Sequence, residues 1–585
     1  MKVLLARILA TFLLFHAYAQ VSGQMDVGAG LTKDLDVRVR ERITPEKIIW
    51  LSDTTNSQVV NAKALLKKGS GQADLEGRNL CNLVGGPSMN PSIVLDFGRE
   101  LHGGIEIVSG IFEGKHPVNV RITLGESVSE AMSQIATSTA TNDHALREFT
   151  VGVPWLGKVH IGNSGFRFAK IEMLDQDRTL KLKEINAISI YRPIPYVGSF
   201  RSSDSLLNEI WNVGAYTVHL NMQDYLWDGI KRDRLVWVGD MHPEVMTILS
   251  VFGNNEVVPK SLDLIQKITH LPDWMNGISS YSMWWIMIQL EWYWNTGDLS
   301  YLQGHQEYLF DLLGVLKSKI DDKGNEQLDG NRFLDWPTSP NKEAIDAGLQ
   351  AMMVMTFSAG AEIASILGED EKRSEYLQVI ELLQKHVPDP NDNKSAAALL
   401  AISGLKSAKE INDAFLSVNP IDGISTFYGY YVLQARALAG DYQGAMEVIK
   451  KYWGGMLALG ATTFWEDFDL RWMKNAGRID QITPQGKIDV HATYGDYCYV
   501  GLRHSLCHGW ASGPTAWLSE HVLGIEILEP GCTKVRVNPH LGELEWVEGS
   551  YPTPFGPITV RHSKTASGGI RSEIETPKEI EVVDI

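Results

Sequence analysis

The chain has 585 residues, a formal net charge of −18 at pH 7 and four cysteines. Its length exceeds what one hydrophobic core can organise, so we expect two to four domains. The acidic balance argues against a nucleic-acid partner, because a negative surface repels a polyanion, and four cysteines are too few for a disulfide framework in a chain of this size.

Residues 1–24 have the layout of a cleavable secretory signal peptide. Lys2 and Arg7 accompany an apolar run, and small residues follow at Ala17 and Ala19. We therefore expect an exported protein, periplasmic or secreted, whose mature chain loses two positive charges and changes its net charge from −18 to −20. No later uninterrupted apolar stretch has the length of a membrane span, so we expect no membrane insertion.

Residues 25–199 have the texture of β-structure. Short alternating runs such as SIVLDFGRE, VNVRITLGE and FRFAKIEML are separated by Gly, Asn and Pro. This alternation is typical of strands with one buried face. We predict an N-terminal β-sandwich domain.

Residues 200–524 change to long segments with helical periodicity, such as DSLLNEIWNVGAYTVHLNMQ and IDAGLQAMMVMTFSAGAEIASIL. In NTGDLSYL and LAGDYQGA, one helix is expected to end at Gly and the next to begin at Asp. Recurring helix pairs of this kind predict a closed toroid of helices. From residue 525 the alternating pattern returns, and we predict a C-terminal β-domain over 525–585.

The stretch WDGIKRDRLVWVGD places three carboxylates, at Asp228, Asp233 and Asp240, among basic residues and tryptophans. Their irregular spacing does not fit helical salt-bridge pairs, and Gly229 and Gly239 interrupt any helical period. A solvated surface could carry the same charges. Loops that combine aromatic and charged residues are nevertheless frequent binding and catalytic sites, and we interpret the stretch as a functional loop.

Three further segments of the helical region combine similar residue types. FLDWPT holds Asp335 and Trp336, GATTFWEDFD holds Glu466, and RHSLCHGWASGPT holds His508. Each alone has a structural explanation, since a lone tryptophan is more often core and a lone glutamate can cap a helix. Together they suit glycoside hydrolysis, which needs one carboxyl group to protonate the leaving oxygen and another to activate water or attack, beside aromatic faces for the sugar.

Two other ligand classes are considered for the same region. Lys231, Arg232 and Arg234 could form a basic pocket for an acidic sugar. His504 and His508 are four residues apart, but no glutamate follows the first histidine as in zinc-binding helices. We therefore expect no metal, and a histidine that bonds to a substrate hydroxyl or a carboxylate.

In their order along the chain, three motifs resemble those of the bacterial α-L-rhamnosidases of glycoside hydrolase family 78. The run from Asp228 to Asp240 is similar to the first signature of that family, GATTFWEDFD to the second and SLCHGWASGPT to the third. The resemblance implies an N-terminal β-sandwich, a central (α/α)6 barrel and a C-terminal β-sandwich. It also implies exo-acting, inverting release of terminal α-L-rhamnose from an oligosaccharide or polysaccharide, without a cofactor.

The resemblance also assigns roles. Glu466 matches the general base that activates water, and Asp233 stands where the family usually has its general acid, a glutamate. An aspartate is one methylene shorter, so either the leaving oxygen approaches further or another acid such as Glu244 acts. The substrate-binding positions are hydroxyl clamps at Asp228, Arg232 and Asp240, aromatic walls at Trp237, Trp336 and Trp472, and the lining residues Asp335 and His508.

Two alternatives stay open. The chain could be an (α/α)6 glycosidase for another α-linked deoxy or uronic sugar. The short acid at Asp233 also fits a secreted glycan-binding protein with a weakened acid site. The glycan, the linkage and the oligomeric state are left open by the sequence.

Overall fold

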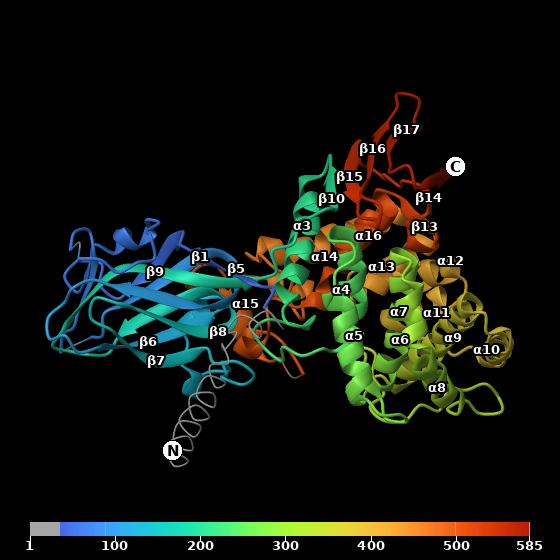
Figure 1. Ribbon diagram of the computed structural model, residues 1–585, viewed down its shortest axis with the longest axis horizontal. Coiled ribbons are helices and arrows are strands. Elements are labelled where there is room, and N and C mark those ends of the chain that lie inside the picture. Colours follow the sequence, from blue (N-terminus) through green and yellow to red (C-terminus); the bar gives the residue numbers. More distant parts are fainter. Residues whose placement is uncertain (1–35, 76, 88, 498, 584–585) are drawn as a thin grey trace, which may run out of the picture.

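The computed structural model describes residues 36–583 apart from 76, 88 and 498, so the predicted signal peptide lies outside the described residues. Along the long axis, a sheet-rich N-terminal part occupies one end and the helices occupy the other (Figure 1). The C-terminal strands pack beside the helices, in red in Figure 1.

The N-terminal part is one nine-stranded antiparallel sheet. Its strands run in the order β3-β4-β9-β5-β8-β6-β7, with β1 on β9 and β2 on β5. They span β1 Val39–Ile43, β2 Lys47–Leu51, β3 Val59–Val60, β4 Cys81–Val84, β5 Ser92–Ser109, β6 Val118–Gly125, β7 Glu148–Val153, β8 Lys158–Met173 and β9 Thr179–Tyr191. Register shifts along β5, which let a long strand bend, allow it to pair with β2, β8 and β9.

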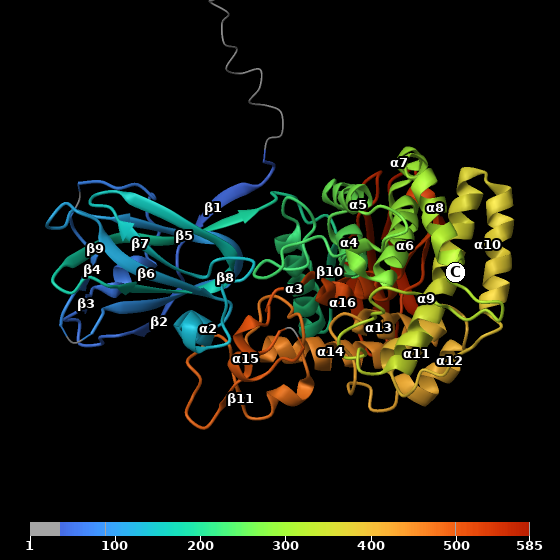
Figure 2. The same ribbon diagram turned by 90° about the horizontal axis from the view of Figure 1, so that it is seen from below.

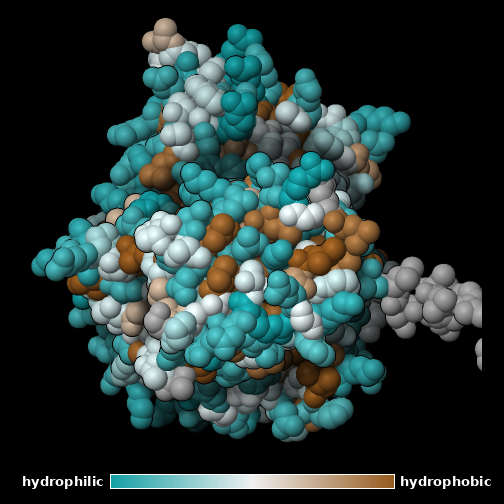
Figure 3. Space-filling model, turned by 90° about the vertical axis from the view of Figure 1, so that its left-hand side faces the viewer, coloured by the Kyte–Doolittle hydropathy of each residue, from teal (hydrophilic) through white to brown (hydrophobic). Residues whose placement is uncertain are grey.

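Apolar side chains of this sheet form a core of their own, which includes Ile93, Ile105, Ile122 and Phe166. Two 3-10 turns, η1 Ala62–Leu66 and η2 Ile135–Thr137, and the short helix α2 Val128–Met132 join the strands. Figure 3 shows this end of the molecule, where hydrophobic residues lie in small groups among hydrophilic ones.

The helical part contains the following elements: α3 Ser205–Asn221, α4 Val238–Val251, α5 Val257–Ile268, η3 Met275–Gly277, α6 Ser279–Thr296, α7 Leu299–Gly304, α8 Gln306–Lys317, α9 Lys342–Leu367, α10 Asp370–Leu383, α11 Lys394–Ile402, α12 Ala408–Ile411, η4 Asn412–Leu416, α13 Gly429–Leu438, α14 Tyr442–Ala458, η5 Leu470–Met473, α15 Val490–Thr493, η6 Gly501–Arg503, η7 Gly509–Ser512, α16 Gly513–Trp517 and η8 Leu518–Val522. The helices α4, α6, α9, α11, α13 and α16 each pack on the next, and α16 packs back on α4. These six helices therefore form a closed ring.

The predicted helix boundaries at Gly-Asp pairs are confirmed. Gly297 ends α6 and Gly440 follows α13, each with a positive φ, and the next residue caps the following helix. Asp298 accepts from the backbone N–H of Tyr301, and Asp441 accepts from that of Gly444. A short polar side chain at this position satisfies an N–H group that the helix itself cannot.

Helix α9 is apolar and long enough to span a membrane by length and composition, which the sequence analysis did not anticipate. The most apolar window of the helix is 72% buried within the protein. It packs against α6, α10 and α11, as the core helix of a ring does.

Two small sheets follow the helices. β13 Ile525–Glu529, β14 Lys534–Val537 and β18 Glu581–Val583 form one, and β15 Trp546–Tyr551, β16 Ile558–Lys564 and β17 Ile570–Glu575 form most of the other. The fourth strand of that second sheet is β10 Ser199–Ser202, which precedes the first helix and pairs with β15. The strand at the predicted boundary between residues 199 and 200 thus joins the C-terminal sheet.

The N-terminal sheet also contacts the segment that connects α14 to the last helices. This segment contains the parallel pair β11 Ala476–Gly477 and β12 Ile488–Asp489 and the short helix α15. It lies between the sheet and the helices, with α15 beside α2 (Figure 2). The N-terminal β-domain therefore contacts a connecting segment of the helical part.

Candidate active site

Eight of the ten predicted site residues line one small cavity at the α4 N-terminus. Its volume is about 200 Å³. The predicted residues that line it are Asp228, Arg232, Asp233, Trp237, Asp240, Trp336, Glu466 and His508. The remaining lining residues are Asn276, Ile278, Tyr281, Asn331, Phe333 and Trp510.

The loop before α4 is closed by Asp228. Its backbone N–H donates to the carbonyl of Leu235 at 3.1 Å, and its carboxylate accepts from the N–H of Leu235 at 3.0 Å. Asp233 and Arg234 follow each other with φ of 55° and 58°. Two consecutive left-handed residues turn the chain sharply and cost conformational energy, which is a feature of functional sites.

Asp240 and His508 form a buried pair at the start of α4. One oxygen of Asp240 lies 3.1 Å from Nε2 of His508, and the other accepts from the hydroxyl of Tyr281 at 3.0 Å. Burial opposes protonation of His508, but the charges of Glu466 and Asp240 outweigh it and raise the pKa of the imidazole. The Nδ1 atom of His508 is buried and has no hydrogen-bond partner among the described residues.

Burial raises the pKa values of Asp228 and Asp240. It raises the pKa of Asp228 well above its ordinary value, with His508 opposing and Asp233 and Asp240 adding to the effect. It also raises the pKa of Asp240, despite the hydrogen bonds from His508 and Tyr281. A carboxyl with a raised pKa can donate a hydrogen bond as well as accept one, which suits sugar hydroxyls.

Glu466 is held from several sides. One carboxylate oxygen accepts from Arg232, and the other accepts from the backbone N–H of Ser505 at 3.3 Å. The carbonyl of Glu466 accepts from the indole of Trp510 at 2.9 Å and from the hydroxyl of Thr426 at 2.6 Å. The bond from Arg232 is charge-assisted and fixes the orientation of the carboxylate.

Asp233 lies on the other arm of the same guanidinium. Its Oδ1 atom is 3.6 Å from Nη1 of Arg232 and 3.3 Å from Nε2 of His144, a residue of the N-terminal β-domain. The side chain of Asp233 is 21% exposed, whereas that of Glu466 is 3% exposed. One arginine therefore brings together a buried carboxylate and a more exposed one.

Glu126 and Glu130 of the β-domain contact two loops that carry residues of the cavity, the loop before α4 and the segment before His508. The ammonium of Lys231 lies 3.0 Å from Glu126 and 3.2 Å from Glu130. Glu126 also accepts from the backbone N–H of Leu506 at 2.6 Å. Burial raises the pKa of Glu126 to about 7, although Lys231 opposes the shift. The cluster thus fixes the loop before α4 to the segment before His508.

Of the three basic residues considered for an acidic sugar, Arg232 lines the cavity and Lys231 and Arg234 do not. Lys231 is paired with Glu126, Arg232 binds Glu466, and Arg234 donates to the carbonyl of Asn163. Each positive charge already has a protein partner.

The two histidines considered for zinc have separate partners. Nε2 of His504 accepts from the backbone N–H of Asp467 at 2.9 Å, while His508 faces Asp240. Within the part of the chain that the structure describes, the one group close enough to hold a metal is Glu126, Glu130 and His491. The Lys231 ammonium bonds to both of these glutamates, so the group is already neutralised by a cation.

Glu244, the alternative acid, is fully buried on α4 and is not among the residues lining the cavity. Its carboxyl packs so closely on Gly509 that a Cβ there would overlap it. Burial, with the nearby charges of Asp240 and Asp228, raises its pKa well above the ordinary value. Glu244 is therefore a buried carboxyl group whose surroundings favour its protonated form.

Asp335 and Trp472 lie outside the cavity. Asp335 accepts from the hydroxyls of Ser395 at 3.0 Å and Ser425 at 2.7 Å, so it fixes the loop that carries Trp336. Trp472 stacks on Tyr494, with ring centres 5.3 Å apart and an angle of 1° between the planes. It lines a neighbouring cavity.

Sequence reasoning missed Tyr281 and Trp510 as lining residues. Trp510 follows His508 by two residues inside the third motif, which is a usable signal, and its ring stacks on Phe427. Tyr281 stands in a tryptophan-rich segment of α6, in which Trp284, Trp285 and Trp292 are at most 2% exposed and belong to the core. Their helical spacing conceals the one aromatic residue among them that reaches the cavity.

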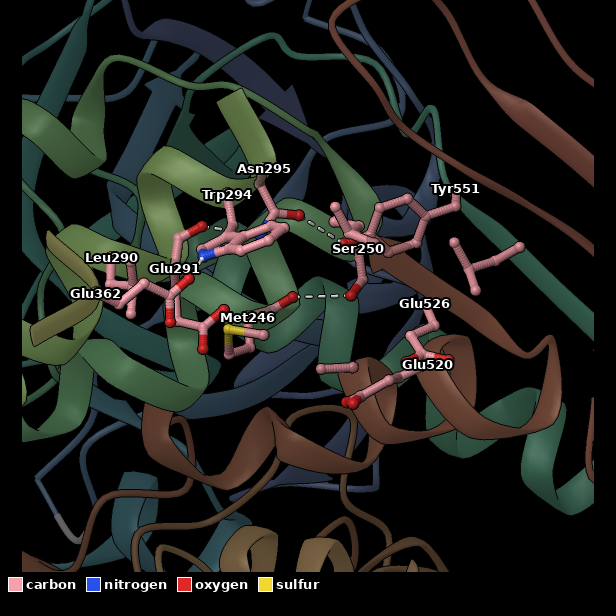
Figure 4. Close-up of a pocket in the computed structure, with 13 residues that line it drawn as sticks. Met246, Ser250, Leu290, Glu291, Trp294, Asn295, Glu362, Glu520, Glu526 and Tyr551 are labelled. Atoms are coloured by element: carbon pink, nitrogen blue, oxygen red, sulfur yellow. Dashed lines mark hydrogen bonds between the residues drawn. The ribbon is translucent and has the colours of Figure 1, made fainter. Parts of the chain in front are cut away.

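A different cavity lies at the far end of α6. It has a volume of about 320 Å³ and includes Glu291, Trp294, Glu362, Glu520 and Tyr551 (Figure 4). Trp294 follows Tyr281 of the catalytic-type cavity by thirteen residues on the same helix, which is roughly 20 Å. None of the predicted site residues lines this second cavity.

Family models match two parts of the chain. Residues 195–389 match the bacterial alpha-L-rhamnosidase 6 hairpin glycosidase domain, and residues 524–583 match the bacterial alpha-L-rhamnosidase C-terminal domain. A curated relative, the alpha-L-rhamnosidase of Alteromonas sp. (strain LOR), is 23% identical over 530 residues, which cover 82% of this chain and 54% of the relative. The chain thus spans about half the length of that relative.

Solved structures agree with this fold. The GH78 family rhamnosidase of Bacillus sp. GL1 superposes with a TM-score of 0.73 at 21% identity, covering 89% of this chain and 55% of that one. The rhamnosidase from Klebsiella oxytoca with rhamnose bound has a TM-score of 0.66 at 19% identity, covering 83% and 96%. The chain therefore carries the six-hairpin glycosidase and C-terminal domains of the bacterial α-L-rhamnosidases, and the family resemblance found in its motifs is confirmed.

Proposed function

We propose that the protein is an exo-acting, inverting α-L-rhamnosidase that releases terminal rhamnose from glycans during polysaccharide degradation. The observation that carries this proposal is the pair of carboxyl groups, Asp233 and Glu466, on the two arms of the Arg232 guanidinium in one small cavity. A cavity of this size favours a single terminal sugar over an internal segment of a chain.

Glu466 is the general base of this mechanism. Arg232 and the Ser505 N–H orient its carboxylate, so that it can take a proton from a water molecule that attacks the anomeric carbon. Asp233 is the general acid and gives its proton to the leaving oxygen. Inversion requires the two carboxyl groups to be far enough apart for water and sugar, on the order of 6.5–9.5 Å.

The sugar hydroxyls face the buried polar side chains of the cavity. Asp228 and Asp240 can donate or accept hydrogen bonds, and His508 lines the cavity beside Asp240. Trp237 and Trp336 provide apolar faces for the ring. Asp335, which is not among the residues that line the cavity, holds the loop that carries Trp336 through its bonds to Ser395 and Ser425.

The proposal extends to the organisation and location of the chain. The proposed domains are an N-terminal β-sandwich within residues 25–199, an (α/α)6 barrel within 200–524 and a C-terminal β-domain within 525–585. The strand β10, at the first of these boundaries, pairs with the C-terminal sheet. Export to the periplasm or the medium rests on the signal pattern in residues 1–24. Mass spectrometry of the N-terminus of protein recovered outside the cytoplasm tests that cleavage.

One experiment tests the activity directly. The purified chain is mixed with 4-nitrophenyl α-L-rhamnoside and with methyl α-L-rhamnoside, and proton NMR records the first-formed sugar. We expect free rhamnose whose anomeric configuration is inverted. A retained configuration contradicts the two-carboxylate assignment. Release of another deoxy or uronic sugar from a matched glycoside panel, with none from rhamnosides, favours the alternative glycosidase. Binding of rhamnose without any turnover favours a glycan-binding protein.

A further inference from the structure

A second cavity adjoins the catalytic one, and no role has been assigned to it. Its volume is about 490 Å³, and its lining includes Pro337, Asp467, Trp472, Tyr494 and Tyr497. Two of these residues directly follow residues of the catalytic cavity in the chain, because Pro337 follows Trp336 and Asp467 follows Glu466. The two cavities therefore share walls.

Aromatic side chains link the two cavities. The rings of Trp336 and Tyr497 stack with centres 5.9 Å apart and an angle of 25° between their planes. Trp336 lines the catalytic cavity and Tyr497 lines the second one. Farther along, Trp472 stacks on Tyr494. Flat apolar faces of this kind are suited to cover sugar rings.

Contacts connect the second cavity to both proposed catalytic carboxyl groups. Asp467, which lines it, follows Glu466, and Arg232, which contacts Asp233 and Glu466, has its guanidinium 5.8 Å from the ring centre of Tyr499. That ring is 6.1 Å from the ring of Tyr497. The small catalytic cavity has room for one sugar, so the sugar attached to it needs adjoining space, which the second cavity provides.

The charges that line the second cavity are mainly negative. Four aspartates line it, Asp422, Asp467, Asp469 and Asp496, and one arginine, Arg471. Arg471 is already paired with Asp469. Burial raises the pKa of Asp467 to about 7, and Asp422 and Asp496 are exposed carboxylates at the rim of the cavity.

We propose that this second cavity binds the sugar to which the rhamnose is attached, and that it selects an uncharged sugar over a uronate. The inference rests on the proposed rhamnosidase activity. The aromatic pair around Trp472 covers the ring, and the carboxylates of Asp422 and Asp496 accept hydroxyl donors but repel a second carboxylate. Trp472, expected from sequence beside the rhamnose, belongs to this neighbouring position.

The test compares four substrates. They are 4-nitrophenyl rhamnoside, methyl rhamnoside, a rhamnosyl-glucose disaccharide and the matching rhamnosyl-glucuronate, which differs from it only at C6. Methyl rhamnoside needs acid assistance as the disaccharide does but has no second sugar, so it is the reference. We expect the wild-type kcat/KM to be higher for the glucose than for the glucuronate compound.

Trp472→Ala should lower the disaccharide-to-methyl ratio of kcat/KM by about tenfold, the order of magnitude of one lost aromatic contact. Trp155→Ala, in the N-terminal β-domain, is the matched control and should leave that ratio unchanged. The double variant Asp422→Asn with Asp496→Asn should lower the ratio of kcat/KM for the glucose compound to that for the glucuronate compound. Added salt should lower the same ratio in the wild type, because it screens the charges.

The outcomes separate this inference from the proposed function. If 4-nitrophenyl rhamnoside is not hydrolysed, the rhamnosidase proposal fails. If it is hydrolysed while Trp472→Ala leaves the disaccharide-to-methyl ratio unchanged, the second cavity does not bind the leaving sugar. A wild-type preference for the glucuronate compound, or no change in preference on neutralising the two aspartates, overturns the charge selection.

Discussion

Nε2 of His144, in the N-terminal β-domain, lies 3.3 Å from Oδ1 of Asp233, in the loop before α4. The contact joins the proposed acid to the β-domain, which carries none of the ten predicted site residues. Asp143, next to His144, lies 2.8 Å from Nε of Arg503. The β-domain loop that carries His144 is therefore also joined to the segment before His508. The β-domain thus positions the shorter acid that stands in place of the usual glutamate.

His144→Ala should therefore impair the substrates that need the acid. We expect turnover of methyl rhamnoside to fall by about tenfold and that of 4-nitrophenyl rhamnoside to change little, because a nitrophenolate leaves without protonation. His116→Ala, an exposed histidine of the same domain, is the matched control. In an Asp233→Asn background His144→Ala should have no further effect on methyl rhamnoside. Equal losses on both substrates in the wild-type background would mean that His144 supports the fold only.

The two carboxyl roles predict two different defects. Asp233→Asn should slow methyl rhamnoside severely and spare 4-nitrophenyl rhamnoside, whereas Glu466→Gln should slow both, because both need an activated water. Loss of a general acid or base costs on the order of a hundredfold to ten-thousandfold. Steady-state kinetics on the two substrates measures the contrast, with Asp233→Glu as the control that restores the acid. The assignment is wrong if both variants show the same pattern.

Local signals in the sequence predicted much of this site. Helix boundaries at Gly297 and Gly440 depend on residues next to each other, so they can be read from the chain. The mixture of carboxylates and tryptophans marked the cavity because glycoside chemistry needs those residue types in any fold. Both signals are independent of long-range pairing.

What the sequence could not reveal depends on partners far apart in the chain. The role of Asp335 is decided by Ser395 and Ser425, which lie 60 and 90 residues away. Lys231 has the residue type of a ligand for an acidic sugar, and only the approach of Glu126 from another domain gives it a structural role. β10 joins the C-terminal sheet for the same reason.

Lys231→Met should destabilise the protein and disturb catalysis together. It leaves Glu126 buried without its cation, whereas Glu130 keeps Arg147 at 3.3 Å. Breaking a buried ion pair typically costs about 3–5 kcal/mol. We expect a lower Tm, measured by calorimetry. The double variant Lys231→Met with Glu126→Gln should recover part of that loss, because one buried charge is then removed. Lys385→Met, at an exposed lysine of the helical domain, is the control. If the double variant is no more stable than Lys231→Met alone, the cluster is not held by charge.

Glu244→Gln tests the buried carboxyl group of α4, and we expect its effect on stability to depend on pH. The pKa of Glu244 is raised by burial and by Asp240 and Asp228, so above its ordinary pKa the unfolded chain releases a proton that the folded chain keeps. The free energy of unfolding therefore falls as pH rises from the unfolded pKa towards the folded one, and no such loss exists below the unfolded pKa. Glutamine cannot ionise, so the variant should raise Tm by a few degrees at pH 8 and change it little at pH 4. Glu371→Gln, at an exposed position of α10, should do neither. The variant should also keep turnover of methyl rhamnoside. If Glu244→Gln instead abolishes that turnover and spares 4-nitrophenyl rhamnoside, Glu244 is the acid and Asp233 is not.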